Sequence, residues 1–201
     1  MGDDAHAARY FAALAELARG IDVASIDAIA DGLAGLRERG GRLFVLGVGG
    51  GAGHASHAVN DFRKLCDIES YAPTDNVSEL TARANDEGWE TTMTGWLRTS
   101  RLCGDDALLV FSVGGGSRQH GVSVNLVAAM ERAHDLGAAI YGVVGTPGGS
   151  LVELSAAAVV IDAPAELRTP LVETLQASVW HALVSHPALA RRTGRWEQVL
   201  G

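Results

Sequence analysis

The pattern of apolar and polar positions divides the chain into helices and short buried strands. Two alanine-rich segments with apolar residues three and four positions apart predict amphipathic helices over residues 3–19 and 25–39. Short continuous apolar runs follow, and such runs are typical of strands covered on both faces of a parallel sheet. The predicted strands are residues 42–47, 107–113, 138–145 and 157–162, with a shorter extended segment at 68–72.

Helical segments separate these strands. They are predicted over residues 53–66, 77–84, 89–102, 122–136, 149–154 and 170–186. For the last of them, Thr169 is the expected N-cap, Pro170 the first helical residue and Pro187 the stop signal. Strands that alternate with helices predict right-handed crossovers and an α/β three-layer αβα sandwich. We expect one domain of 201 residues, in which residues 1–40 form a helical extension that packs on it or on a neighbouring subunit.

Composition and charge narrow the possible functions. Hydrophobic residues make up 47% of the chain and charged residues 20%, which indicates a folded globular protein. A net charge of -8 argues against nucleic acid and anionic membranes as partners. No apolar run is long enough to span a bilayer and no signal-peptide pattern is present, so we expect a cytoplasmic protein. Cys66 and Cys103 are expected to be reduced and buried.

Three glycine-rich loops, at residues 48–53, 114–117 and 146–149, follow predicted strands. In parallel sheets ligands bind at the carboxyl ends of the strands, and glycine lets backbone amides and helix N-termini approach a phosphate. The alternative is that these loops are only tight turns. The spacing of Gly47, Gly49 and Ala52 also matches a dinucleotide-binding pattern, but two helices precede this strand, which makes a nicotinamide enzyme the weaker interpretation.

Two pairs of ionisable residues could carry chemistry. His57 and Asp61 are four residues apart on one helical face and can share a metal or a substrate. Glu173 and His181 are eight residues apart, about 12 Å along a helix axis, so they must lean inward or serve sites in different subunits. Each pair can also be an ordinary structural pair, and spacing alone favours that interpretation.

Four stretches together resemble the sugar isomerase (SIS) domain family, specifically its phosphoheptose isomerase branch. They are residues 46–51 with the following His57, residues 73–88, residues 110–117, and the last helix with His181. The resemblance spans nearly the whole chain. It implies a five-stranded parallel sheet and a homotetramer with active sites between subunits. It also implies conversion of sedoheptulose 7-phosphate to D-glycero-D-manno-heptose 7-phosphate, an aldose.

The resemblance implies a zinc ion held by His57, Asp61, Glu173 and His181. The family has Glu at the position of Asp61 and Gln at the position of Glu173. Isomerisation needs a base that moves a proton between C1 and C2 through an enediolate, an acid–base partner for the oxygens, and positive charge near the developing oxyanion. Our hypothesis makes Asp61 or Glu173 the base, His181 the acid–base partner and zinc the electrophile.

The same resemblance implies a set of substrate-binding residues: Gly49, Gly50, Gly51, Asn85, Asp86, Ser112, Gly114, Gly115 and Ser117. The phosphate loop has lost two hydroxyl donors that the family carries. A substrate-binding arginine of the family falls at Leu65, for which Arg63 or Lys64 is a candidate replacement. Two further functions stay open: a non-catalytic SIS module that binds a sugar phosphate or a protein partner, and an isomerase for a different phosphosugar. The tail over residues 188–201, with three arginines, is expected to be a solvated end.

Overall fold

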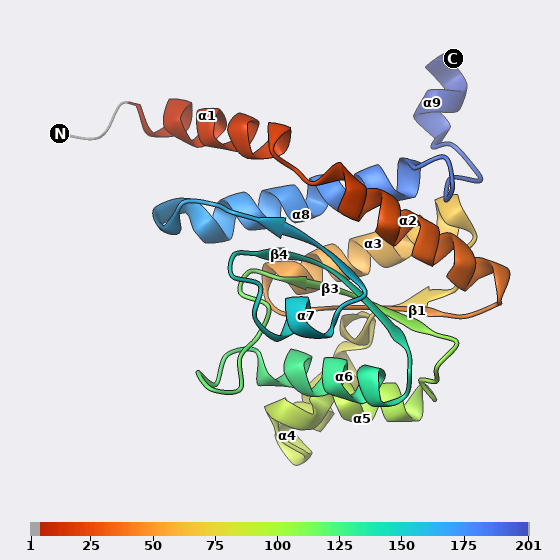
Figure 1. The fold of residues 1–201 in the computed structure, drawn as a ribbon. Coiled ribbons are helices and arrows are strands. Elements are labelled where there is room, and N and C mark those ends of the chain that lie inside the picture. The colour runs from red at the N-terminus through yellow and green to blue at the C-terminus, as the bar shows by residue number, and fades with distance from the viewer. Residues whose placement is uncertain (1–4, 201) are drawn as a thin grey trace.

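The computed structural model describes residues 5–200 and shows a three-layer αβα sandwich around one parallel sheet (Figure 1). The sheet has five strands in the order β2-β1-β3-β4-β5, and every neighbouring pair is parallel. The strands are β1 (Leu43–Gly47), β2 (Ser70–Tyr71), β3 (Ala107–Ser112), β4 (Ala139–Gly145) and β5 (Ala157–Ile161). The predicted fold class and the predicted strands are confirmed, although β2 is shorter than the segment predicted for it.

Helices cover both faces of the sheet. One face carries α2 (Val23–Glu38), α3 (Gly50–Cys66) and α8 (Arg168–Ser185), and α1 (His6–Arg19) extends from it (Figure 1). The other face carries α4 (Val77–Asp86), α5 (Thr92–Thr99), α6 (Val124–Asp135) and α7 (Gly149–Leu154). Short 3₁₀ turns lie at Pro73–Asp75, Trp89–Thr91 and Ala165–Leu167, and α9 (Arg195–Leu200) ends the described chain.

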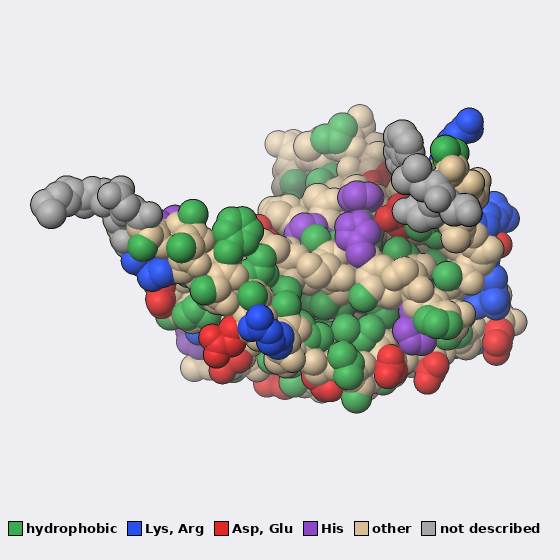
Figure 2. All heavy atoms as spheres, turned by 90° about the horizontal axis from the view of Figure 1, so that it is seen from above, with side chains coloured by type: hydrophobic (Ala, Val, Ile, Leu, Met, Phe, Trp, Pro, Cys, Tyr) green, Lys and Arg blue, Asp and Glu red, His purple; other side chains and the backbone are tan. Residues whose placement is uncertain are grey.

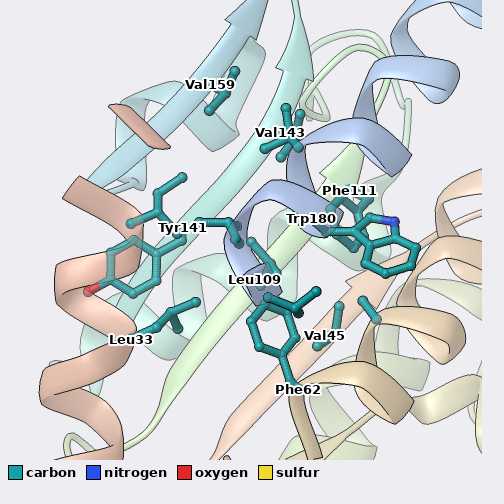
Figure 3. Packing of buried hydrophobic residues seen from close by; sticks show 14 of the residues in the cluster. Leu33, Val45, Phe62, Leu109, Phe111, Tyr141, Val143, Val159 and Trp180 are labelled. Atoms are coloured by element: carbon teal, nitrogen blue, oxygen red, sulfur yellow. The ribbon is translucent and has the colours of Figure 1, made fainter. Parts of the chain in front are cut away.

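Alternate residues of each strand point to opposite faces and build two separate cores. In β1 and β3, Val45, Leu109 and Phe111 pack under α3 and α8, whereas Phe44 and Leu108 pack against α5 and α6. Figure 3 shows the first core, which also holds buried side chains of α2, α3 and α8. Because both faces are covered, the strands are continuously apolar, and this is the reason that they could be predicted from the sequence.

The last long helix begins earlier than predicted. Arg168 is its first residue and Leu167 precedes it, so Thr169 lies inside the helix instead of capping it, and Pro170 is the third residue. Proline is tolerated there because the amides of the first turn have no partner within the helix. The early start places Glu173 in the second turn of α8, close to the glycine loops.

A buried ion pair ties the amino-terminal edge of the sheet together. The carboxylate of Asp106 is 2% exposed and accepts hydrogen bonds from Nη2 of Arg42 at 2.7 Å, from the Arg42 amide at 3.0 Å and from the Cys103 amide at 3.0 Å. Burial alone would raise the pKa of Asp106, but these donors outweigh it and hold that pKa below its usual value. The pair therefore fixes the start of β1 to the turn before β3.

The two cysteines differ in environment. Cys66 is buried, and burial raises the pKa of its thiol to about 11. The prediction that Cys103 is buried is wrong: it lies exposed in the turn between α5 and β3. Among residues 5–200, no helix is both long enough and apolar enough to cross a bilayer.

Candidate active site

The three glycine-rich loops lie together at the carboxyl edge of the sheet, because β1, β3 and β4 are neighbours in it. The loop after β4 is bonded to the loop after β3: the Leu151 amide donates to the Gly115 carbonyl at 3.0 Å and the Ser150 amide to the Gly116 carbonyl at 3.1 Å. Gly115 has φ of 76°, and a side chain there would overlap the Gly148 carbonyl. The close approach of the two loops thus accounts for this glycine.

The loop after β3 is longer than the sequence analysis assumed. Ser112 Oγ accepts the Gly115 amide at 3.0 Å, which closes the first turn, and the space beside Gly114 is open. Ser117 then pairs with Val122 in a small hairpin, and its hydroxyl lies 3.0 Å from Nδ1 of His120. The helix α6 starts only after this hairpin, so Ser117 does not directly precede the helix N-terminus.

The loop after β1 leads directly into α3. Gly49 has φ of 60° and precedes the helix, which begins at Gly50. A Cβ at Gly51 would lie 2.6 Å from the Phe111 carbonyl oxygen, so the start of α3 packs on β3 without room for a side chain. The amides of this first turn point toward the loop edge, where a helix attracts negative charge.

Three of the four predicted metal ligands meet on the outer face of α3 and α8. The ligand atoms of His57, Asp61 and His181 all lie within 4.8 Å of one another. His57 Nε2 is 3.8 Å from Asp61 Oδ2, and the Asp61 side chain is 15% exposed. Figure 2 shows this face, where histidine side chains gather over the two helices. Two imidazoles and a carboxylate are ligands that Zn²⁺ favours, so these residues fit a metal site.

The surroundings of this group fix its imidazoles. Trp180 is buried under it, with its ring centroid 4.6 Å from that of His57 and 3.5 Å from that of His181. His181 Nδ1 lies 2.8 Å from the Ala177 carbonyl oxygen, which can only accept, so Nδ1 carries the proton. The lone pair of Nε2 is then free for a metal or a proton, as in histidines that a carbonyl orients for metal binding.

Glu173 lies outside this group, at the N-terminus of α3. A side chain at Gly50 would overlap the Glu173 carboxylate, so the glycine makes room for it. His54, which the sequence analysis did not select, lies in the same place, close to the backbone carbonyl and the carboxylate of Glu173 and with its ring 6.1 Å from that of Phe111. Burial lowers the pKa of His54 and the nearby Glu173 offsets this only in part, so the ring is neutral near pH 7.

Two of the predicted substrate residues, Asn85 and Asp86, lie on the other side of the sheet from α3 and α8. Asn85 and Asp86 lie at the end of α4, where the Asn85 amide donates to the Asp86 carboxylate at 2.7 Å, and α4 covers the opposite face of the sheet (Figure 1). Arg63 is used elsewhere, since its Nη1 donates to the Ser70 carbonyl at 3.0 Å and its guanidinium stacks over Tyr71.

A cavity opens beside the metal-binding group. It has a volume of about 420 Å³, and Asp61, His181 and Arg192 are among its lining residues. An arginine next to two metal-competent side chains is suited to an anionic substrate, because guanidinium binds carboxylate and phosphate oxygens through several donors. No pattern in the sequence predicts Arg192 at this place. The amides of Arg191 and Arg192 both donate to the Leu65 carbonyl, at 2.8 and 3.1 Å, so the expectation of a solvated end is wrong for this segment.

Two solved structures of phosphoheptose isomerases superpose on this chain. The structure of phosphoheptose isomerase from Neisseria gonorrhoeae superposes with a TM-score of 0.76 at 23% identity, covering 90% of this chain and 93% of that one. A phosphoheptose isomerase structure from Francisella tularensis gives the same TM-score and identity. These matches show that the chain has the fold of phosphoheptose isomerases. No protein-family model matches the chain.

Sequence comparison then gives the family. The phosphoheptose isomerase of Solidesulfovibrio magneticus is 30% identical over 181 residues, which cover 88% of this chain and 79% of that protein. The chain belongs to the phosphoheptose isomerase family. It is also 36% identical over 159 residues to the lincomycin biosynthesis protein LmbN of Streptomyces lincolnensis, a match that spans 73% of this chain and 56% of that protein.

Proposed function

We propose that the protein is a phosphosugar ketose–aldose isomerase that converts sedoheptulose 7-phosphate to D-glycero-D-manno-heptose 7-phosphate. The observation that carries this proposal is the junction of α3 and α8, where His57, Asp61 and His181 meet beside a cavity. A protein that only binds a sugar phosphate has no need for three metal-competent groups at one point. Membership in the phosphoheptose isomerase family supports the same reaction.

The residues divide into a metal-binding group and a proton-transfer pair. We assign His57, Asp61 and His181 to Zn²⁺, which when bound would supply positive charge for the enediolate oxygen. The resemblance to the family predicts Glu173 as the fourth metal ligand, but the position of its carboxylate beside Gly50 supports a different role. A carboxylate outside the metal group is free to accept a proton, so we assign Glu173 as the base.

The proton balance follows from this assignment. Glu173 removes a proton from C1 of the ketose and returns it to C2, while a proton moves from the C1 oxygen to the C2 oxygen. His181, predicted as the acid–base partner for the oxygens, can use Nε2 for this only when that nitrogen does not bind the metal. The neutral ring of His54 lies beside Glu173 and is the second candidate for the oxygen proton.

We further propose that the active protein is a homotetramer in which a neighbouring subunit completes the site. Helix α1 has no buried residue, and Phe11 on it is 65% exposed, which supports an intermolecular contact for this helix. A neighbouring subunit could also bring Asn85, Asp86 and the loop at Ser112–Ser117 to the site. The two free cysteines support the cytoplasmic location that the sequence predicts.

Turnover of sedoheptulose 7-phosphate, followed by the appearance of the aldose in NMR spectra, tests the activity. Glu173→Gln is expected to lower kcat by at least about 10²-fold, the usual contribution of general acid–base catalysis. Asp61→Asn is expected to lower kcat together with metal content, which atomic emission measures independently of turnover. If neither variant loses activity to this extent, the assignment of these carboxylates is wrong. No aldose from the wild-type protein with its metal bound would reject the substrate.

A further inference from the structure

The loop after β3 ends in a small hairpin before α6 begins. The Ser117 amide donates to the Val122 carbonyl at 2.9 Å, and the Val122 amide donates to the Ser117 carbonyl at 3.0 Å. The turn is closed by the Gly121 amide, which donates to the Arg118 carbonyl at 3.2 Å, and Gly121 has φ of 63°. The hairpin therefore folds residues 118–121 back toward Ser117, at the carboxyl edge of the sheet.

Arg118 fixes this hairpin to two other elements. Its Nε donates to Glu131 of α6 at 2.8 Å and its Nη2 donates to the other oxygen of the same carboxylate. Its Nη1 donates to Glu90, in the 3₁₀ turn at Trp89–Thr91, at 2.9 Å. A bidentate arginine–carboxylate pair restricts the orientation of both side chains. Arg118 is therefore engaged by two carboxylates and serves to hold the hairpin in place.

The hairpin places the exposed His120 against the half-buried Ser117. Ser117 Oγ accepts the His120 amide at 3.2 Å, and Nδ1 of the imidazole lies 3.0 Å from the same oxygen. A hydroxyl has one proton to donate and two lone pairs that accept. When Nδ1 carries a proton, both lone pairs of Oγ are occupied and the hydroxyl proton is free for another partner. When Nδ1 carries none, the hydroxyl donates to the ring instead.

A phosphate group selects the first of these two arrangements. The oxygens of an ionised phosphate accept hydrogen bonds, so they need a hydroxyl whose proton is not donated elsewhere. The space beside Gly114 in the same loop is open. Residues 112–117 contain only two hydroxyl groups, on Ser112 and Ser117, and the direction of each proton therefore matters more than in a loop with many donors.

We propose that His120 is a positioning residue, whose Nδ1–H fixes the Ser117 hydroxyl as a donor to the phosphate of the sugar substrate. The identification of this ligand rests on the proposed function. Ser117 touches the phosphate, and the imidazole acts through it. A hydroxyl whose direction is fixed before binding loses less conformational freedom when the ligand arrives, which compensates in part for the hydroxyls that this loop lacks.

Calorimetric titration of the full chain with inorganic phosphate, at constant ionic strength, tests this role without any turnover. His120→Ala is expected to weaken phosphate binding about fivefold, the usual effect of losing one hydrogen bond. His120→Asn puts an amide donor near the place of Nδ1 and is expected to restore most of the affinity. His120→Gln puts its amide near the place of Nε2 and is expected to restore little. Gln119→Ala changes an exposed neighbour in the same hairpin and is expected to bind like the wild type.

A double variant shows whether the imidazole acts through the hydroxyl. Ser117→Ala is expected to weaken phosphate binding at least as much as His120→Ala. Adding His120→Ala to Ser117→Ala is then expected to cause no further loss, because the hydroxyl that His120 directs is already absent. Losses that multiply in the double variant, or better binding with Gln than with Asn at position 120, would show that the imidazole contacts phosphate itself and would overturn the positioning role.

The source of the phosphate is read from the kinetics of the same variants. If His120→Ala raises KM for sedoheptulose 7-phosphate about fivefold and leaves kcat within about twofold, the phosphate belongs to the substrate. If phosphate binding weakens and KM is unchanged, the substrate identification is overturned. Wild-type protein that binds no phosphate at millimolar concentration, or His120→Ala protein that binds it like the wild type, would overturn the role of His120. A protein that shows the expected phosphate effects and isomerises no sugar would reject only the proposed function.

Discussion

Zinc binding distinguishes a three-ligand site from the four-ligand site of the family pattern. The structure brings His57, Asp61 and His181 within 4.8 Å, with Glu173 outside this group. A ligand that binds only the folded state at 100 times its Kd stabilises that state by about 2.7 kcal/mol. For a chain of 201 residues this corresponds to a rise in Tm of roughly 5–11 °C, at about 2–4 °C per kcal/mol.

The variants then separate ligands from neighbours. His57→Ala or His181→Ala is expected to weaken zinc binding about 100-fold, so that the same zinc concentration only equals the new Kd and adds about 0.4 kcal/mol, or a shift of less than about 2 °C. Glu173→Gln is expected to keep the full shift. His134→Ala, on the opposite layer, is the matched control. Scanning calorimetry of metal-free protein with and without zinc gives these shifts, and a Glu173→Gln variant whose shift falls like that of His57→Ala would refute the three-ligand site.

Two further predictions concern backbone space and buried charge. Gly50→Ala is expected to displace the Glu173 carboxylate and to lower kcat by at least about tenfold with little change in Tm. Gly53→Ala is the control, because a Cβ there meets no atom within 4 Å, and it is expected to leave kcat unchanged. Equal kcat values for the two variants would contradict the place given to Glu173. Asp106→Asn is expected to lower the free energy of unfolding by about 3 kcal/mol and Tm by roughly 6–12 °C. This is the low end of the range for breaking a buried ion pair, because Arg42 stays partly hydrated. The pKa of Asp106 is lower in the folded protein than in the unfolded chain. The ionised carboxylate therefore stabilises the folded protein fully at a pH above the pKa of the unfolded chain, and this stabilisation is lost as the pH falls through the pKa of the folded protein. In thermal melts from neutral to acidic pH the destabilisation by Asp106→Asn should shrink toward acid, and a pH-independent difference would contradict this origin.

The fold could be predicted because its signals are local. Strands buried on both faces must be continuously apolar, so β1, β3 and β4 were visible as runs. His57 and Asp61 were visible as a pair because four residues return a helix to the same face. These features require no knowledge of how distant segments pack.

The parts of the site that were missed depend on distant packing. How α8 lies against α3 decides that Glu173 meets Gly50 instead of joining His57, Asp61 and His181, and nothing in the sequence of α8 alone states this. His54 has no signal in the sequence, because its neighbours are the backbone carbonyl and the carboxylate of Glu173 on a distant helix. The place of Arg192 depends on hydrogen bonds to carbonyls, which every residue carries and which no sequence pattern can reveal.

The carboxylate of Glu173 changes the electrostatics of the first glycine loop. A carboxylate at the N-terminus of α3 satisfies part of the positive end of that helix, so a phosphate gains less there than in a protein with a neutral amide at this position. The phosphate must then be held at the loop after β3 or by basic side chains. The loop after β3 shares the carboxyl edge of the sheet with the first glycine loop, and it carries the hydroxyls of Ser112 and Ser117 and open space beside Gly114. A phosphate held at the loop after β3 does not compete with the Glu173 carboxylate for the positive end of α3.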